Sequence, residues 1–144
     1  MKICILYDSK YGIGKRCVEY LGSYLREKEN QVEIYSIKDI KPKSIPQVDV
    51  YIFSAPTHFG NVSFKMKGYL NKIKEKEGKR YAVITTCLGP ESKAVDTMEE
   101  ILNDKGMEKV SNGLKIKVNS MKGPPEEEYE TKLKEFADEI MKAM

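Results

Sequence analysis

The turn at residues 9–14, with the sequence SKYGIG, has the residue types of an anion-binding site. It follows the apolar run 2–7, and Val18, Leu21 and Leu25 recur after it at helical spacing. A turn between a strand and a helix leaves backbone N–H groups without acceptors at the positive end of the helix dipole. Such junctions commonly hold phosphate, so this turn predicts a phosphate site.

Apolar runs of strand length recur at 32–36, 48–54, 81–86 and 114–118, and segments with a helical stripe alternate with them. Five strands alternating with helices predict an α/β fold, namely a three-layer, doubly wound, five-stranded parallel sheet in the order 2-1-3-4-5. After the first helix, three further helices are expected, each with apolar side chains at helical spacing that face inward. These side chains are Met66, Tyr69, Leu70 and Ile73; Val95, Met98, Ile101 and Leu102; and Tyr129, Leu133, Phe136, Ile140 and Met144.

Three loops of this sheet are expected to meet at one place. Ligands of doubly wound sheets bind at the carboxyl ends of the strands, beside the point where the strand order reverses. The loops that flank this point are 9–14, 55–62 and 87–91. Pro56 opens the second of them, and we expect it to be a loop without strand structure.

Composition excludes several classes of protein. The 144 residues are enough for one domain with a core, so we expect residues 1–144 to form a single domain. Lys and Arg number 25 against 22 Asp and Glu, without a basic block, which argues against nucleic-acid binding. No apolar run approaches the roughly 20 residues of a membrane span, and no signal segment is visible, so we expect a cytoplasmic protein without a membrane partner.

The cysteines predict neither a disulfide framework nor a metal site. Cys4, Cys17 and Cys87 lie far apart and form no C-x-x-C pair. We therefore expect three reduced thiols. Cys87 falls in a predicted site loop, but no basic residue close in sequence would lower its pKa, so we expect it to pack rather than react.

Other phosphate-binding motifs fit the turn less well. A nucleotide-hydrolysing loop needs a metal-binding hydroxyl where Arg16 stands, and a dinucleotide fingerprint needs a small residue where Cys17 stands. A phospho-receiver domain needs a carboxylate at the end of the third strand, where Ser54 stands. Without that partner, Asp8 is expected to cap the backbone of its own turn.

Residues 7–14 (YDSKYGIG) and 54–61 (SAPTHFGN) resemble the phosphate loop and the second flavin loop of flavodoxins. The resemblance covers nearly the whole chain, whose length matches the short-chain members, and it implies a flavodoxin-like fold. Residues 56–62, followed by Met66 and Lys67, are also similar to a loop of the flavin-dependent quinone oxidoreductases of the tryptophan-repressor-binding-protein type. Those enzymes are longer and carry a segment for which this chain has no room.

The resemblance implies that FMN binds noncovalently, with its phosphate on the first loop and its isoalloxazine ring between the second and third loops. It implies no catalytic side chain and no metal ligand. The residues implied to bind the cofactor are Ser9, Lys10, Tyr11, Gly12, Ile13, Gly14, Pro56, Thr57, His58, Phe59, Gly60, Asn61, Cys87, Leu88 and Gly89.

The phosphate loop departs from the family pattern. Flavodoxins usually offer hydroxyl groups at its first, third and last places, where this chain has Ser9, Tyr11 and Gly14. Backbone N–H groups are then the expected donors, with charge supplied by Lys15 or Arg16 at the start of the helix.

The surroundings of the ring depart from the pattern as well. Flavodoxins commonly place the ring between a Trp and a Tyr, whereas this chain contains no Trp. Phe59 and His58 remain as candidates for stacking on the ring. One open face of the ring would lower the affinity for FMN and leave space for an approaching molecule.

The resemblance implies an electron carrier that shuttles single electrons through a flavin semiquinone, rather than an enzyme with its own substrate. The carbonyl between Gly60 and Asn61 is expected to turn toward the reduced ring, because positive φ costs glycine little. An FMN-dependent NAD(P)H:quinone-type oxidoreductase and a flavin-free interaction module stay open as alternatives.

The net charge of +3, with Lys10 and His58 in the predicted loops, favours an acidic redox partner protein. A monomer and a weak homodimer are both open.

Overall fold

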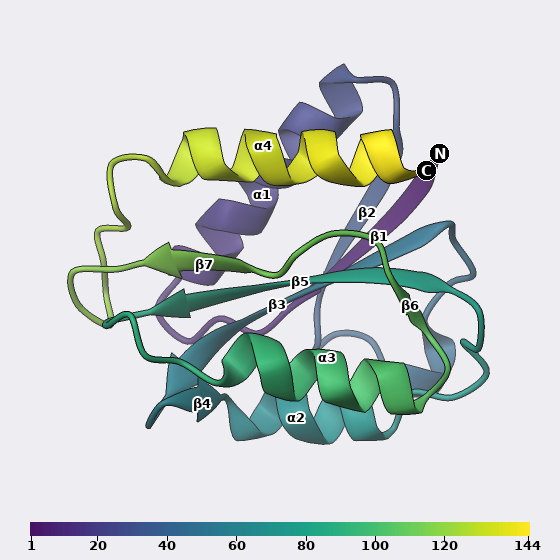
Figure 1. Cartoon of the computed structure of the whole chain (residues 1–144), viewed down its shortest axis with the longest axis horizontal. Helices are drawn as coiled ribbons and strands as arrows, with labels where there is room; N and C mark the ends of the chain where they lie inside the picture. The colour runs from purple at the N-terminus through teal and green to yellow at the C-terminus, as the bar shows by residue number, and fades with distance from the viewer.

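The computed structural model describes residues 1–144 and contains one twisted sheet between two layers of helices (Figure 1). The three inner strands are β1 (Lys2–Tyr7), β3 (Val50–His58) and β5 (Arg80–Cys87). The strand β2 (Gln31–Ser36) forms one edge, and β6 (Glu108–Lys109) and β7 (Leu114–Lys117) pair with β5 in turn at the other edge. All of these pairs are parallel, and the order β2-β1-β3-β5-β6 confirms the predicted order, with β6 and β7 as two halves of the fifth strand.

Two helices cover each face of the sheet (Figure 1). On one face, α1 (Ile13–Glu27) and α4 (Tyr129–Ala143) pack on the strands through a cluster that includes Leu21, Leu133 and Phe136. On the other face lie α2 (Phe64–Asn71) and α3 (Ala94–Asp104). A single turn of 3-10 helix at 42–44 lies in the connection from β2 to β3.

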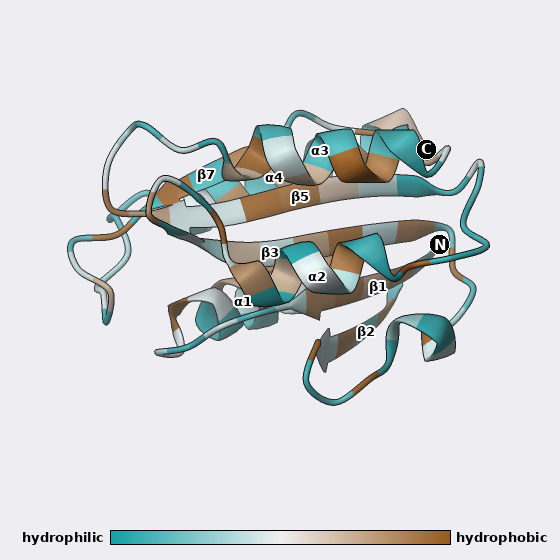
Figure 2. Cartoon of the chain, turned by 90° about the horizontal axis from the view of Figure 1, so that it is seen from below, coloured by the Kyte–Doolittle hydropathy of each residue, from teal (hydrophilic) through white to brown (hydrophobic).

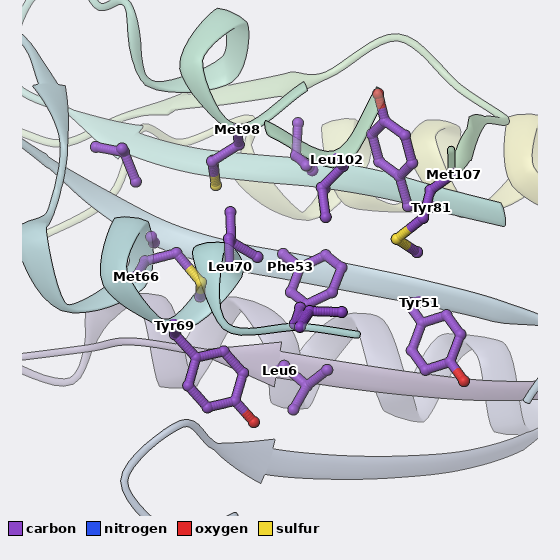
Figure 3. Packing of buried hydrophobic residues seen from close by; sticks show 14 of the residues in the cluster. Leu6, Tyr51, Phe53, Met66, Tyr69, Leu70, Tyr81, Met98, Leu102 and Met107 are labelled. Atoms are coloured by element: carbon purple, nitrogen blue, oxygen red, sulfur yellow. The ribbon is translucent and has the colours of Figure 1, made fainter. Parts of the chain in front are cut away.

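The face under α2 and α3 is closed by large apolar side chains. Figure 3 shows Phe53 of β3 among Leu70 of α2 and Leu102 of α3, and all three are buried. Burial of such side chains supplies most of the driving force for folding, at about 25 cal/mol per Å² of apolar surface. Figure 2 shows apolar stretches along the inner strands, and an apolar cluster lies on each side of the sheet, so both faces are covered as the continuous apolar runs predict.

Residues 55–62 are not the loop that we expected. The strand β3 continues to His58 and turns at Phe59 and Gly60 into β4 (Asn61–Val62), which pairs with β3 in antiparallel register. Phe59 and Gly60 have φ values of +53° and +81°, which allow the tight turn between the two strands. Only two residue pairs hold this hairpin, and such a short alternation gives no periodic signal in the sequence.

One further expectation needs correction, and the fifth strand has a feature that the sequence did not predict. Met144 was expected to point inward, but α4 ends at Ala143 and the Met144 side chain is 43% exposed. The fifth strand is interrupted between β6 and β7, where Gly113 lies so close to Val95 of α3 that an added Cβ would be 2.3 Å from its Cγ1. The helix α3 thus crosses the strand at a place where only glycine fits.

The end of α2 is fixed by a side chain from beyond α3. The ammonium group of Lys105 donates hydrogen bonds to the carbonyl oxygens of Asn71 (2.9 Å) and Ile73 (2.7 Å). A cation at this position satisfies carbonyl groups that the helix leaves free and opposes the negative end of its dipole. Ile73 is buried although the helix has already ended, which agrees with its place in the predicted stripe.

Candidate functional site

The last residues of β3 and β5 and the loops after β1, β3 and β5 line one cleft at the carboxyl ends of these strands, with a volume of about 450 Å³. This end of the sheet, at the left of Figure 1, is where the strands β5 and β7 terminate. A fourth segment, after β7, completes the wall. The lining residues are Asp8, Ser9, Lys10, Tyr11, Ile13, Gly14, Pro56, Thr57, His58, Phe59, Thr86, Cys87, Leu88, Val118 and Met121.

The first loop presents main-chain donors. Gly12 occupies the N-cap position of α1 in a left-handed conformation, and no side chain accepts a hydrogen bond from the first turn of the helix. The hydroxyl of Ser9 accepts instead from the backbone N–H of Gly12 within the loop, at 3.1 Å. The N–H groups at the start of α1 therefore keep their capacity to bind an anion, as the sequence predicts.

Lys15 and Arg16, which we expected to supply charge to this loop, contact residues outside the cleft. The Nε of Arg16 donates a 3.1 Å hydrogen bond to the hydroxyl of Tyr129 in α4, and Lys15 lies 3.9 Å from Glu19 on the surface of α1. Neither side chain lines the cleft. Arg16 is thus tied to α4, and Lys15 lies beside an acidic residue of its own helix.

Two other ammonium groups lie near the ring of Tyr11 in the first loop. The ammonium group of Lys10 lies 5.4 Å from the centre of the Tyr11 ring, and that of Lys122 lies 5.9 Å from it. Lys10 itself lines the cleft, and Lys122 belongs to the segment after β7. A tyrosine face attracts ammonium groups through its quadrupole, which keeps both charges close to the first loop.

Asp8 does not cap its own turn, which corrects our expectation. Its carboxylate is only 6% exposed and accepts a 2.7 Å hydrogen bond from the hydroxyl of Ser63, the N-cap residue of α2. Ser9 has taken over the capping of the turn. The carboxylate at the end of β1 therefore fixes the first loop to the beginning of α2.

A chain of hydroxyl groups joins the hairpin to the third loop. The Oγ1 of Thr57 lies 2.8 Å from the Oγ1 of Thr85 and 2.7 Å from the Oγ of Ser92. The carbonyl oxygen of Gly60, at the tip of the hairpin, accepts a 2.8 Å hydrogen bond from the backbone N–H of Lys93. These contacts hold the turn of the hairpin against the segment that leads into α3.

The environment of the thiol in the cleft favours its protonated form. Burial raises the pKa of Cys87, outweighing the lowering by Lys115, and its Sγ lies 3.9 Å from the carbonyl oxygen of Ile116. Reactive cysteines have lowered pKa values instead. The neighbouring Leu88 leaves 53% of its surface exposed at the mouth of the cleft.

Most of the cofactor-binding residues implied by the resemblance lie together in the cleft. Four of them belong to the same three loops without lining it, namely Gly12, Gly60, Asn61 and Gly89. Gly12 caps α1, Gly60 binds Lys93, and the Asn61 side chain accepts from the N–H of Val62.

Four lining residues were missed, namely Asp8, Thr86, Val118 and Met121. Asp8 and Thr86 directly precede predicted loops, so the rule that ligands bind at strand ends could have included them. Val118 and Met121 follow the fifth strand, which we did not associate with the reversal of strand order. No pattern in that segment marks it as part of a site.

A doubly wound α/β domain with an anion-binding turn and an apolar cleft at its strand ends has the architecture of a mononucleotide-binding protein. Residues 4–117 match the family model of the flavodoxin domain, and the chain belongs to the flavodoxin family. Flavodoxins are flavin-containing electron carriers that act with redox partners. None of the helices is long and apolar enough to cross a membrane.

Similar proteins come from several bacteria. A flavodoxin of Clostridium saccharobutylicum is 28% identical over 120 residues, which cover 79% of this chain and 75% of the relative. The crystal structure of oxidised flavodoxin 1 from Bacillus cereus is 26% identical with a TM-score of 0.84, covering 100% of this chain and 99% of that one. The rubredoxin oxygen:oxidoreductase of Desulfovibrio gigas is 21% identical with a TM-score of 0.84, and the match covers 99% of this chain but 35% of that larger one, which shows a shared fold.

Proposed function

We propose that this protein binds FMN noncovalently in the cleft and carries electrons one at a time between redox partners. The observation that supports this most is the combination of uncapped N–H groups at the start of α1 with an apolar cleft beside them. The N–H groups and Lys10 hold the phosphate. The ring lies between residues 56–61 and residues 87–89.

The residues of the cleft fit this cofactor. Its volume of about 450 Å³ lies within the range of about 300–1,000 Å³ that small-ligand sites have. Asp8 is the one carboxylate in the lining, and it is turned toward Ser63 rather than toward an incoming phosphate. The side-chain hydroxyls that flavodoxins usually offer are replaced here by main-chain donors and nearby ammonium groups.

When bound, the flavin supplies the chemistry of electron uptake and release, and the chain adjusts its surroundings. The hairpin is the part of the chain best suited to this. Glycine at position 60 tolerates rotation of the following peptide, while the N–H of Lys93 holds the Gly60 carbonyl in one orientation. Rotation of that carbonyl toward the ring must break this hydrogen bond.

We propose further that the redox partner is acidic. The ammonium groups of Lys10 and Lys122 lie beside the cleft, and the net charge of the chain is +3. The Phe59 ring at the tip of the hairpin also lines the cleft, is fully exposed and offers an apolar contact to a partner. Opposite charges around an apolar contact accelerate association, and salt screens this effect. Association should therefore slow as ionic strength rises.

In this proposal residues 1–144 act as one domain, as a monomer or weak homodimer in the cytoplasm. The three cysteines support a cytoplasmic location, because all of them are buried free thiols. Unpaired thiols are typical of proteins that stay in a reducing environment.

Titration of the apoprotein tests the cofactor proposal. We expect FMN to bind with quenching of its fluorescence, riboflavin to bind more weakly, and inorganic phosphate to compete with FMN. Photoreduction should then yield two one-electron steps, with little oxidation of NAD(P)H when a quinone is added. Equal affinity for riboflavin and FMN would contradict a phosphate site on the first loop, rapid quinone reduction would point to an oxidoreductase, and absence of any flavin binding would overturn the proposal.

A further inference from the structure

The segment 118–125, between β7 and α4, forms a wall of the cleft that none of the three loops provides. Val118 and Met121 line the cleft together with the first loop and with Leu88. The segment begins where the backbone N–H of Val118 donates a 2.8 Å hydrogen bond to the carbonyl oxygen of Cys87, at the end of β5. It is therefore attached to the sheet directly beside the third loop.

The segment also has a fixed shape of its own. Val118 and Pro125 form an antiparallel bridge, and the N–H of Asn119 donates to the carbonyl oxygen of Pro124 at 3.0 Å. At the tip, the N–H of Gly123 donates to the carbonyl of Ser120, whose hydroxyl donates back to the carbonyl of Gly123 at 2.7 Å. Backbone groups paired in this way fix the path of the chain on both sides of Met121 without help from a ligand.

Two contacts seat the tip on the first loop. Gly123 lies so close to Ile13 that an added Cβ would be 2.4 Å from its Cδ1. Lys122 places its ammonium group 5.9 Å from the centre of the Tyr11 ring. The segment thus spans from the third loop to the first, across the side of the cleft where Met121 lies.

This side of the cleft has no aromatic residue on its third loop, and its exposed apolar side chains are Leu88 and Met121, which are 53% and 50% exposed. Apolar side chains that are half exposed in a fixed segment gain when a planar apolar group covers them. A thioether is also well suited to contact an aromatic ring, because its sulfur is polarisable.

We propose that the segment 118–125 is a fourth cofactor-binding segment, in which Met121 contacts the flavin ring and replaces the aromatic residue that the third loop lacks. This inference rests on the proposed binding of FMN. Met121 is the binding residue, and Lys122 and Gly123 are positioning residues that hold it through Tyr11 and Ile13. Since the contact is to the ring, it serves FMN and riboflavin alike.

Substitution of Met121 tests the proposal with a matched control. We expect Met121→Ala to weaken the binding of FMN and of riboflavin by the same factor, about three- to tenfold, and Met121→Leu to retain most of the affinity. Competition by inorganic phosphate should not change. Met144→Ala, which removes another exposed methionine at the far end of α4, should bind both ligands as the unsubstituted protein does.

A second measurement does not depend on the substitutions. In the protein labelled with 13C at its methionine methyl groups, FMN should shift the Met121 resonance through the ring current and leave the Met144 resonance in place. If the unsubstituted protein binds FMN but Met121→Ala binds equally well and the Met121 methyl does not shift, the fourth segment is refuted and the proposed function stands. If the unsubstituted protein binds no flavin, both proposals fail together.

Discussion

The carboxylate of Asp8 and the hydroxyl of Ser63 lie 2.7 Å apart, although 55 positions of the sequence separate them. Ser63 also accepts a hydrogen bond from the N–H of Met66, so one hydroxyl caps α2 and satisfies a buried carboxylate at the end of β1. The first loop, which we expect to hold the phosphate, is in this way anchored to the helix that follows the hairpin.

Removing the Ser63 hydroxyl should therefore cost more than the loss of a helix cap. In Ser63→Ala, the N-terminus of α2 loses its cap and the Asp8 carboxylate stays buried without its donor. We expect the free energy of unfolding in urea to fall by about 2–3 kcal/mol, whereas Ser63→Thr should retain most of it. A loss well below about 1 kcal/mol in Ser63→Ala would mean that the carboxylate finds another donor.

Glu126, which directly follows the segment 118–125, should make the free energy of unfolding depend on pH in the acidic range. Burial raises the pKa of its carboxyl group, but the hydrogen bonds from Lys132 (2.8 Å) and from the N–H of Lys117 (2.7 Å) outweigh burial and lower the pKa below its ordinary value. A lowered pKa in the folded state stabilises the protein above the unfolded-state pKa, and this stabilisation disappears as the pH falls through the folded-state pKa.

We therefore expect Glu126→Gln to lower the free energy of unfolding by about 1 kcal/mol at neutral pH. The difference from the unsubstituted protein should narrow as the pH falls below about 4.3, which denaturation curves at a series of pH values will measure. The adjacent Glu127 is exposed, and Glu127→Gln should show no such convergence. A difference that stays constant with pH would assign the effect to packing rather than to charge.

Substitution of Gly60 should affect both the hairpin and the flavin. With φ at +81°, a β-branched residue is strained, so Gly60→Val should destabilise the protein by about 1–2 kcal/mol. It should also hinder rotation of the Gly60 peptide, and the two one-electron reduction potentials should move closer together in a redox titration. Gly68→Ala, on the exposed side of α2, should leave both potentials unchanged. An unchanged spacing in Gly60→Val would contradict the role of this peptide.

The thiols should be inert in the folded protein. Burial raises the pKa of Cys4 to about 12 and that of Cys17 to about 11, and it raises the pKa of Cys87 as well. The thiolate is the reactive form, so at neutral pH we expect almost no reaction with a disulfide reagent until the protein unfolds, after which all three thiols should react. One thiol that reacts rapidly at neutral pH in the native state would show that Cys87 is accessible and activated.

The strand order could be predicted because its signals are local. Continuous apolar runs mark the covered strands β1, β3 and β5, and apolar stripes mark the helices, which together leave few arrangements of a parallel sheet. The hairpin could not be predicted, since two residue pairs are too few to show a period. The orientation of Met144 could not be predicted either, because it depends on where α4 ends rather than on spacing.

The parts of the site where a turn follows a strand could be predicted from the sequence. The positions of side chains that depend on contacts between distant segments could not. The glycines of residues 9–14 indicate a turn, and in the structure no side chain caps the N–H groups at the start of α1. The partnership of Arg16 with Tyr129 joins positions 113 residues apart and has no local signal. The same holds for Met121, whose position depends on how Gly123 packs on Ile13.

The edge strands on both sides of the sheet carry charged side chains. Glu33 is exposed on β2, and Lys115 and Lys117 are exposed on β7. A strand of a second molecule that added to β7 would have to strip water from two ammonium groups before any ladder formed. We accordingly expect no association of two sheets edge to edge, so that encounters with other molecules are left to the surface around the cleft.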